Sequence, residues 1–463
     1  MSGTLTRDQN KNTVHTKMGK FQWGVATSSH QIEGYNDKND WWDFEAQGNI
    51  EGGAKSGAAT DHWNRFPEDI KLAAELGVTS YRFSIEWSRI EPAEGRWDES
   101  ALDWYANLIT ECEKYNIMPM LTLHHFTSPQ WFAAKGGFAW GEAPTRFSLF
   151  VKKVVARLGS RVPVWCTLNE PMVLVGGTYL GRFMPPAQYS PQLASKACHG
   201  LLKCHALAYD IIHSEIKTRE GPWKDHPIEV GIAHNMLDFK ADRWWHPIEQ
   251  VLRFVFNRFY NQSWLDAITG RRQIFGVWGL VPFPPQVREA RGRKTADFIG
   301  INYYTKAYVQ WHPRAAALER PSDLPLGITF ARRKEVTSDL EWAIHPKGFR
   351  NILNLVAKYK LPIYITENGI ADKEDALRPD FLFSHLRELA RAMERGVDVR
   401  GYYHWSLLDN FEWIKGFGPR FGLFKVNYDT FERTPTRSAE EYKKIIESHK
   451  NRKNASPSTD YFH

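Results

Sequence analysis

The sequence has few cysteines, no long apolar run and only a small excess of one charge. Its 463 residues include four cysteines, none of which forms a C-x-x-C pair. A disulfide framework and a cysteine-based zinc site are therefore not expected. No apolar run is long enough to span a bilayer, and the mean hydropathy of −0.49 agrees. The N-terminal stretch lacks a signal-peptide pattern, so the sequence predicts a reduced, cytoplasmic protein without membrane contact.

The charge balance argues against a nucleic-acid partner. Lys plus Arg number 60 and Asp plus Glu number 53, a formal charge of +7 that is scattered along the chain. Such a pattern gives little support to binding a polyanion. Aromatic residues, in contrast, are abundant, with 19 Trp, 18 Tyr and 27 Phe. Most of them are expected to fill the core, although an indole face can also stack on a flat apolar ligand surface.

Eight short β-rich apolar runs recur along the chain, with helical patterns between several of them. The runs cover 21–28, 80–85, 118–124, 164–168, 229–234, 297–303, 361–366 and 399–406. Clear helical patterns cover 67–76, 101–115 and 384–395. Alternation of strands and helices predicts a parallel sheet, and eight such units predict a single α/β domain, a (β/α)8 TIM barrel.

Long segments after several runs are expected to form the active-site loops of this barrel. These irregular segments cover 34–60, 171–191, 311–337 and 410–434. A doubly wound open sheet is the alternative fold, but no G-x-G-x-x-G follows the first run. We expect a polar N-terminal extension over 1–18, one catalytic barrel over 19–447 and a polar C-terminal tail over 448–463.

Polar side chains follow most of the apolar runs, where a barrel places its active site. Two of them are the carboxylates Glu170 and Glu367, which end the fourth and seventh runs. Each alone could be an ordinary ion-paired acid, but strands three places apart can direct both into one pocket. Paired carboxylates are typical of glycoside hydrolysis, in which one donates a proton and the other attacks as an anion. Arg82 and Tyr304 are the available cation and donor for the anionic partner.

The pair His124-His125 could instead be half of a metal site. No third ligand with supporting spacing is evident in the sequence, so we expect neither a metal nor a cofactor.

Two motifs carry a family resemblance. Thr-Leu-Asn-Glu-Pro at 167–171 and Ile-Thr-Glu-Asn-Gly at 365–369 resemble the two signatures of glycoside hydrolase family 1, the β-glucosidases and β-galactosidases. The resemblance implies a TIM barrel and retention of anomeric configuration through a covalent glycosyl-enzyme intermediate. It also implies that Glu170 is the acid/base and Glu367 the nucleophile, with carboxyl groups roughly 5–5.5 Å apart.

The resemblance also assigns roles to the residues around the pair. By this resemblance, Asn169 would bind the 2-hydroxyl of the sugar, and Asn302 and Tyr304 would support the two carboxylates. The implied substrate-binding residues are Gln31, His125, Phe126, Trp342 at the pocket mouth, Trp405 as a stacking platform, Glu412 and Trp413 on the 4- and 6-hydroxyls, and Phe421.

Three departures from the family pattern affect substrate preference. Phe126 and Met172 stand where many members have aromatic residues, Trp in the case of Phe126, and the loop 181–186 differs from common versions.

The sequence therefore predicts an exo-β-glycosidase acting on terminal β-D-glucosides, with β-galactosides and β-fucosides as further substrates. The alternatives are a transglycosidase, a non-catalytic sugar-binding protein of the same fold, and a metal-dependent barrel hydrolase. The expected partner is a small-molecule β-glycoside or oligosaccharide, and the sequence does not specify an oligomeric state.

Overall fold

The computed structural model describes residues 21–271, 292–312 and 328–451. The N-terminal extension expected over 1–18 lies outside the described residues, as does 452–463. The last described helix runs to Asn451, so the tail boundary expected at residue 448 falls inside that helix.

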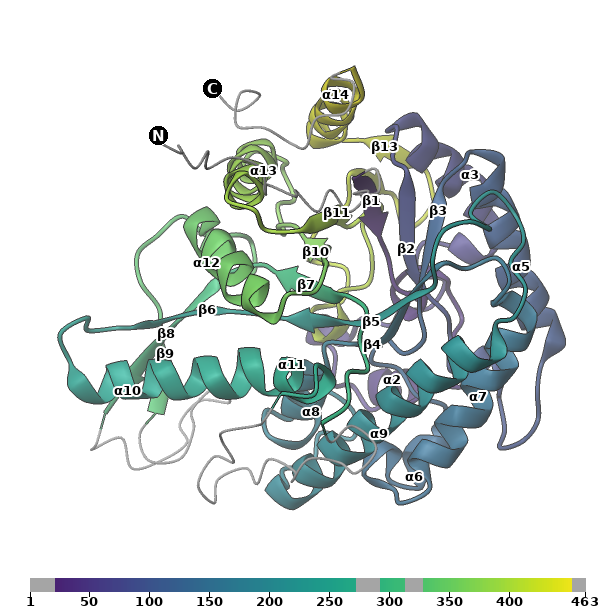
Figure 1. Ribbon diagram of the computed structural model, residues 1–463, viewed down its shortest axis with the longest axis horizontal. Helices are drawn as coiled ribbons and strands as arrows, with labels where there is room; N and C mark the ends of the chain where they lie inside the picture. The colour runs from purple at the N-terminus through teal and green to yellow at the C-terminus, as the bar shows by residue number, and fades with distance from the viewer. Residues whose placement is uncertain (1–20, 272–291, 313–327, 452–463) are drawn as a thin grey trace, which may run out of the picture.

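Eight parallel strands close into a barrel (Figure 1). They are β1 (Gln22–Ala26), β2 (Ser80–Ser84), β3 (Met118–Thr122), β4 (Val164–Asn169), β5 (Glu229–Asn235), β7 (Ile299–Tyr303), β10 (Ile363–Asn368) and β11 (Val399–Trp405). Each strand pairs with its neighbour in sequence order, and β1 pairs with β11 to close the ring. This arrangement confirms the predicted TIM barrel.

Helices surround the barrel and bury its outer face (Figure 1). The α-helices are α1 (Ser29–Ile32), α2 (Asp40–Ala46), α3 (His62–Glu75), α4 (Trp87–Ile90), α5 (Glu99–Lys114), α6 (Gln130–Ala134), α7 (Ala143–Leu158), α8 (Pro171–Tyr179), α9 (Pro191–Glu215), α10 (Pro247–Phe256), α11 (Ser263–Ile268), α12 (Pro346–Val356), α13 (Arg378–Glu394) and α14 (Arg437–Asn451). A separate, smaller cluster fills the barrel interior, where Met120, Cys166 and Tyr364 meet.

All eight predicted strands are present, and each boundary agrees to within two residues. The strands were recognisable because barrel strands are buried on both faces and therefore form continuous apolar runs. The helix expected over 67–76 instead begins at His62, so Pro67 lies inside α3. Trp63 in this added turn stacks on Trp104 of α5 at 4.1 Å, and this packing supports the turn ahead of the proline.

Two further expectations about elements were wrong. Helix α13 begins at Arg378, six residues before the predicted start at 384. The segments 34–60 and 171–191 are not wholly irregular, because the first contains α2 and the first nine residues of the second form α8. A proline at the first position favours a helix, and in α8 it outweighs the paired glycines at 176 and 177.

A second sheet beside the barrel was not predicted. It consists of β6 (Asp238–Ala241), β8 (Lys306–Trp311) and β9 (Ile328–Ala331), and Figure 1 shows it extending sideways next to α10. A short hairpin of β12 (Phe424–Val426) and β13 (Arg433–Pro435) lies in the segment 410–434.

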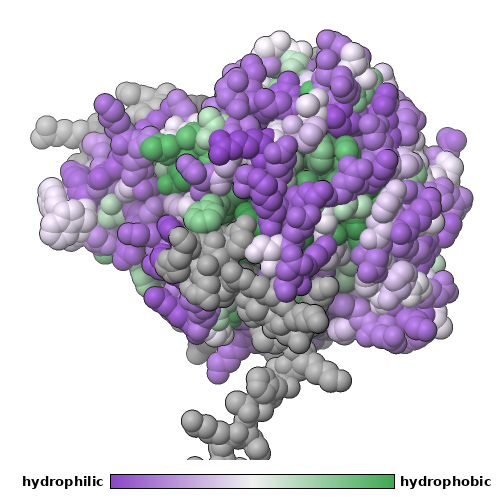
Figure 2. Space-filling model, turned by 90° about the horizontal axis from the view of Figure 1, so that it is seen from above, coloured by the Kyte–Doolittle hydropathy of each residue, from purple (hydrophilic) through white to green (hydrophobic). Residues whose placement is uncertain are grey.

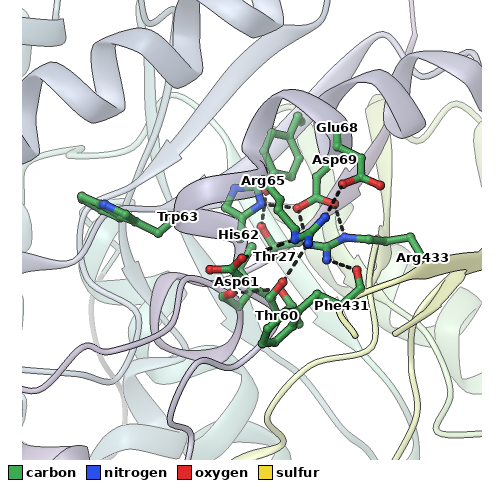
Figure 3. Close-up of polar contacts among 12 residues, drawn as sticks. Thr27, Thr60, Asp61, His62, Trp63, Arg65, Glu68, Asp69, Phe431 and Arg433 are labelled. Carbon is green, nitrogen blue, oxygen red and sulfur yellow. Dashed lines mark hydrogen bonds and ion pairs between the residues drawn. The ribbon is translucent and has the colours of Figure 1, made fainter. Parts of the chain in front are cut away.

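Buried charges connect this hairpin to the first loop region of the barrel (Figure 3). Arg433 in β13 donates to Asp69 of α3 from Nε at 2.8 Å and from Nη2 at 3.0 Å. Asp69 also accepts from His62 Nδ1 at 2.7 Å, and Arg433 donates to the Thr60 carbonyl. The Thr60 hydroxyl in turn donates to the Ile32 carbonyl. Arg433, near the end of the chain, therefore helps to stabilise the segment that follows β1.

The face seen in Figure 2 is mostly hydrophilic, with smaller hydrophobic areas between the polar side chains. No helix in the described ranges is both long and apolar enough to cross a membrane. All four cysteines are buried with free thiols, and they are Cys112, Cys166, Cys198 and Cys204.

Candidate active site

Two glutamates from strands three places apart in the barrel meet in one polar network. Glu170 directly follows β4, and Glu367 lies near the end of β10. Asn302 of β7 lies between them: its Nδ2 donates to Glu170 Oε1 at 2.7 Å, and its Oδ1 accepts from Thr366 Oγ1 at 2.6 Å. One amide therefore bridges the strand ends that carry the two carboxylates.

Donors contact both oxygens of the Glu367 carboxylate. Arg82 Nη1 lies 2.5 Å from Oε1, and the Tyr304 hydroxyl donates to Oε2 at 2.5 Å. The pairing of β10 with β7 shifts register between Ile365 and Glu367. Irregularities of this kind re-aim side chains next to active sites. The structure thus brings together the carboxylate, cation and hydroxyl that the sequence predicted.

Arg82 is fully buried inside the barrel and reaches residues of three other strands. Its Nε donates to Thr122 Oγ1 of β3 at 3.1 Å, and its Nη2 donates to Asn169 Oδ1 of β4 at 2.8 Å. Its Nη1 also donates to the Thr366 carbonyl of β10 at 3.2 Å. A buried guanidinium needs this many acceptors, because an unpaired buried charge is costly.

The two glutamates differ in their protonation because their surroundings differ. Burial raises the pKa of Glu367, while the charge of Arg82 and the hydrogen bond from Tyr304 oppose that rise. Burial also raises the pKa of Glu170, to about 8, and the negative charge of Glu367 adds to the rise. Because the cationic donor and the hydroxyl contact Glu367, that residue ionises first and Glu170 keeps its proton near neutral pH.

The backbone at Glu170 is in the left-handed region, with φ at 45°. Such a conformation persists in a non-glycine residue only where the surroundings hold it. The Glu170 N–H donates to the Ala233 carbonyl of β5 at 2.7 Å, and Asn235 Nδ2 lies 3.3 Å from Glu170 Oε1. The left-handed turn therefore directs the carboxyl group toward the amides of β5 and β7.

Asn235 is a site residue that the sequence analysis missed. It ends β5, so the rule used for the other strand ends would have found it. Its Oδ1 accepts from the Tyr260 hydroxyl at 2.7 Å, which fixes the orientation of the amide toward Glu170. Tyr260 lies in the π-helical segment η3 (Asn257–Gln262), and no sequence signal pointed to it.

The hydrogen bonds around His125 define its tautomer. Arg82 can only donate, so the Oδ1 atom of Asn169 faces Arg82 and its Nδ2 donates to His125 Nε2 at 3.1 Å. The ring proton is therefore on Nδ1, which is buried and has no partner among the described residues. Burial lowers the pKa of His125 well below its usual value, so the ring is neutral. The Nδ1–H group is available to a ligand hydroxyl.

Gln31 and Glu412 lie together in a second polar group. Gln31 Nε2 donates to Asn410 Oδ1 at 2.8 Å and to the Phe411 carbonyl at 2.9 Å, and it lies 3.3 Å from Glu412 Oε2. Burial raises the pKa of Glu412 to about 8, and the negative charge of Glu367 adds to the rise. Glu412 can therefore donate as well as accept a hydrogen bond near neutral pH.

Aromatic rings surround these polar groups. The His125 ring stacks on Trp405 at 5.8 Å and on Trp413 at 6.1 Å, with interplanar angles of 19° and 15°. Phe126 packs its edge against Trp413 at 5.3 Å. These four predicted residues are therefore in mutual contact through their rings.

A second group of rings lies on the outer side of Glu367. Trp342 is 36% exposed and packs against Tyr304 at 5.5 Å and Phe421 at 6.3 Å. Because Tyr304 contacts Glu367 directly, the partly exposed indole of Trp342 lies one ring away from the carboxylate. The role of Trp342 at the mouth of the pocket stays a prediction.

The sequence departures have different surroundings in the structure. Met172 packs in the main core cluster between barrel and helices. Met184, from the unusual loop 181–186, packs in the cluster that contains Phe126 and Trp413. Phe126 and this loop therefore affect the pocket wall more directly than Met172 does.

The histidine pair considered as a metal half-site has other contacts. His124 Nε2 lies 3.1 Å from Ser128 Oγ, and His125 bonds to Asn169. Within the described ranges, no cluster of three or more His, Cys, Asp or Glu side chains is arranged to hold a metal ion.

A closed barrel with two buried glutamates at its strand ends defines a barrel glycoside hydrolase. Comparison with known families agrees: the sequence profile of Glycosyl hydrolase family 1 matches residues 15–451. The chain belongs to glycosyl hydrolase family 1 and is a glycoside hydrolase, which confirms the resemblance seen in its motifs.

Similar proteins of known activity align along nearly the whole chain. Beta-glucosidase A of Thermotoga maritima is 31% identical, over 92% of this chain and 97% of its own length. Beta-glucosidase A of Acetivibrio thermocellus is 32% identical with the same coverage, and a beta-galactosidase of Pyrococcus woesei is 29% identical over 90% and 94%. The activity class that these relatives share is β-glycoside hydrolysis.

Solved structures give the same answer for the fold. The family 1 β-glucosidase from Thermotoga maritima superposes with a TM-score of 0.84 at 31% identity, covering 92% of this chain and 97% of that one. The same enzyme in complex with isofagomine lactam gives a TM-score of 0.84 at 30% identity, with the same coverage.

Proposed function

We propose that this glycoside hydrolase is a retaining exo-β-glycosidase that removes terminal non-reducing β-D-glucosyl units. The observation that carries the proposal is the unequal environment of two linked, buried carboxyls. Arg82 and Tyr304 hold Glu367 as an anion, whereas burial and the charge of Glu367 keep Glu170 protonated. A protonated acid and an anionic nucleophile in one pocket are the requirements of double displacement.

In the first step Glu367 attacks the anomeric carbon, and Glu170 gives its proton to the departing glycosidic oxygen. The attack converts the Glu367 carboxylate into a neutral ester of the sugar. Because the negative charge of Glu367 contributes to the high pKa of Glu170, that pKa falls once the ester has formed. Glu170 is then an anion and can act as a base.

In the second step Glu170 takes a proton from water, and the resulting hydroxide attacks the same carbon. The ester bond to Glu367 breaks, so the sugar leaves with its original configuration. If an alcohol replaces water in this step, the product is a new glycoside, which is the transglycosidase alternative.

The groups around the carboxylates suit a neutral, polyhydroxylated ring. The unpaired Nδ1–H of His125 can donate to a hydroxyl, and Glu412 can donate or accept. Trp405 supplies a flat apolar face of the kind on which sugar C–H groups stack. The relatives named beta-glucosidase and beta-galactosidase support glucosides as substrates, with galactosides and fucosides accepted in addition.

The nucleophile can be tested by removal and chemical rescue. In Glu367→Gly, we expect hydrolysis of an aryl β-glucoside to fall by about 10⁴-fold or more, because covalent catalysis contributes most of the rate. Added azide should restore turnover and give a glycosyl azide of inverted configuration, which NMR of the product identifies.

Asp372→Asn is a matched control, because it changes a buried acid that follows the same strand but bonds to backbone N–H groups. Asp372→Asn should hydrolyse the aryl β-glucoside without added azide. Normal activity in Glu367→Gly, or rescue with retained configuration, would contradict the assignment of the nucleophile.

Substrate preference follows from kcat/KM measured side by side on aryl β-glucoside, β-galactoside and β-fucoside. We expect the glucoside to be hydrolysed with the highest value, and the other two within about 100-fold, since one hydroxyl contact changes transition-state binding by about 1–3 kcal/mol. No turnover of any of the three would contradict the exo-β-glycosidase proposal and favour a sugar-binding role.

A further inference from the structure

A buried histidine–glutamate pair lies behind the aromatic rings of the pocket and takes no part in the reaction proposed above. His30 of α1 and Glu45 of α2 are 1% and 3% exposed, and His30 Nε2 lies 2.8 Å from Glu45 Oε1. His30 directly precedes Gln31, so one short helix carries both side chains.

Hydrogen bonds fix both ring nitrogens of His30. Asn39 Oδ1 accepts from the Trp42 N–H at 2.9 Å, so its Nδ2 faces His30 Nδ1 at 3.0 Å and donates to it. The ring proton is therefore on Nε2, where it is donated to Glu45. A ring held at both nitrogens cannot rotate about its χ2 angle without losing hydrogen bonds in a buried site.

The carboxylate of Glu45 is fixed in turn. Its Oε2 atom accepts from the Ser56 N–H at 2.7 Å and from the Ser56 hydroxyl at 2.9 Å. Three donors thus converge on one carboxylate, which joins α1 to α2 and to the loop after it. A buried carboxylate with this number of partners has few unsatisfied hydrogen-bonding positions.

The His30 ring is one end of a stack of four rings. His30 lies parallel to Trp413, at 5.9 Å and 12°. Trp413 is also parallel to His125, and His125 is parallel to Trp405. We call His30, Trp413, His125 and Trp405 the ring stack. The other three members are candidate sugar-contacting residues, whereas His30 is held by hydrogen bonds to Glu45 and Asn39.

The backbone of Trp413 increases the need for such an anchor. Its φ of 51° is in the left-handed region, which costs a non-glycine residue about 1–3 kcal/mol. Packing must therefore hold the indole in place, and Trp41 at 4.7 Å and Phe126 at 5.3 Å pack against it together with His30.

We propose that the His30–Glu45 pair is a positioning device that fixes Trp413 and Gln31 against the terminal sugar and so sets the discrimination between glucosides and galactosides. The inference rests on the proposed function, because it takes Trp413 and Gln31 as sugar-contacting residues. Glucosides and galactosides differ in the orientation of the 4-hydroxyl, which is the group expected near Glu412 and Trp413. A tilt of the Trp413 ring therefore changes the binding of glucosides and of galactosides by unequal amounts.

Two variants of Glu45 test the proposal. Glu45→Ala removes all three hydrogen bonds of the carboxylate, and we expect KM for the aryl β-glucoside to rise on the order of tenfold, with a smaller change in kcat. The ratio of kcat/KM for glucoside to that for galactoside should move severalfold toward one. Glu45→Gln keeps one acceptor oxygen and faces the remaining donors with an NH₂ group, so its effects should be intermediate.

A second buried histidine–carboxylate pair in the same region supplies the control. His62 and Asp69 are 2.7 Å apart and equally buried, but they contact the hairpin strand β13 through Arg433 and are not part of the ring stack (Figure 3). Asp69→Asn should lower the melting temperature and leave the ratio of the two kcat/KM values at its wild-type level.

The positioning role is supported if the ratio of kcat/KM for glucoside to that for galactoside changes stepwise from wild type to Glu45→Gln to Glu45→Ala. Asp69→Asn should not show this change. A wild-type KM and ratio in either folded Glu45 variant, even with a lower melting temperature, overturns the positioning role. Hydrolysis of both substrates by the wild-type enzyme is the reference measurement and tests the proposed function separately.

Discussion

Glu170 and Glu367 have the same side chain, and their neighbours decide which one carries the proton. Glu367 accepts hydrogen bonds from a guanidinium and a hydroxyl, whereas Glu170 accepts from the neutral amides of Asn302 and Asn235. Neutral donors stabilise an anion less than a charged donor does. The difference in protonation between the two glutamates therefore comes from the partners and not from the burial, which the two residues share.

We expect kcat/KM for an aryl β-glucoside to fall on the alkaline side as Glu170 loses its proton. Burial and the charge of Glu367 raise the pKa of Glu170 to about 8. The acid is therefore present below that pH, and activity is lost as the pH rises through it. The measurement is a pH–rate profile of kcat/KM, which reports ionisations of the free enzyme.

Glu170→Gln provides the comparison when the substrate has a dinitrophenyl leaving group, which departs without a proton. With this substrate the variant should lack the alkaline fall and keep the acid-side fall, since Glu367 must still ionise. An alkaline fall that persists unchanged in Glu170→Gln with this substrate would mean that the fall comes from an ionisation other than that of Glu170.

At the scale of single residues, the sequence was most informative where function places a polar group at the end of an apolar run. Asn302 and the two glutamates were found in this way, and Arg82 was found as a cation within the second run. Asn235 follows the same pattern and was overlooked, whereas Tyr260 and Glu45 could not be found. Their roles depend on contacts with residues that are distant in the sequence or that carry no motif, and only the fold creates those contacts.

At the scale of elements, β10 and β11 approach each other closely just beyond their paired residues, two residues after Glu367. Gly369 follows β10 so closely against β11 that an added Cβ would lie 1.8 Å from the Trp405 carbonyl oxygen. In Gly369→Ala we expect the two strand ends to separate, and kcat/KM to fall on the order of 10–100-fold, because small misplacements of catalytic groups are costly. Kinetics and thermal melting of the purified variant measure this.

Gly141→Ala is a control of the same chemical change, since an added Cβ there meets nothing within 4 Å and the residue lies in an exposed turn. It should leave kcat/KM and the melting temperature close to wild type. Wild-type kinetics in Gly369→Ala would show that the position of Glu367 tolerates a shift between these strands.

The elements that could be predicted are those whose burial is uniform. Strands β2, β3 and β4 are buried at every position, and such burial favours runs rich in apolar and β-forming residues. Strand β8 of the side sheet is mostly half-buried, so it shows neither a continuous run nor a clear alternation. Helix α3 was predicted too short because a stacking contact with another helix, invisible locally, extends it past Pro67.

At the scale of the whole molecule, the buried carboxyls of the site connect stability to pH. Burial and the charge of Glu367 raise the pKa values of Glu170 and Glu412 to about 8, from a usual 4.5. The folded state therefore keeps protons that the unfolded chain releases. This contribution to stability is complete below pH 4.5 and is lost as the pH rises through 8.

At pH 9 we therefore expect Glu412→Gln to have a higher melting temperature than wild type, because an amide needs no proton to stay neutral. The expected gain in the free energy of unfolding is on the order of 1–2 kcal/mol. At pH 4.5 the two proteins should melt within about 0.5 kcal/mol of each other. Glu440→Gln, on the exposed face of α14, should show the wild-type pH dependence. A constant difference between Glu412→Gln and wild type at all pH values would contradict this linkage.

The buried position of Arg82 has a consequence for how the protein is made. Its carboxylate partner follows 285 residues later in the chain, and the barrel closes only when β11 pairs with β1. During synthesis on the ribosome, the guanidinium must stay hydrated until most of the polypeptide has emerged. Any shorter nascent chain thus lacks acceptors for this buried charge, and the contacts of Arg82 are complete only after the seventh barrel strand has been added.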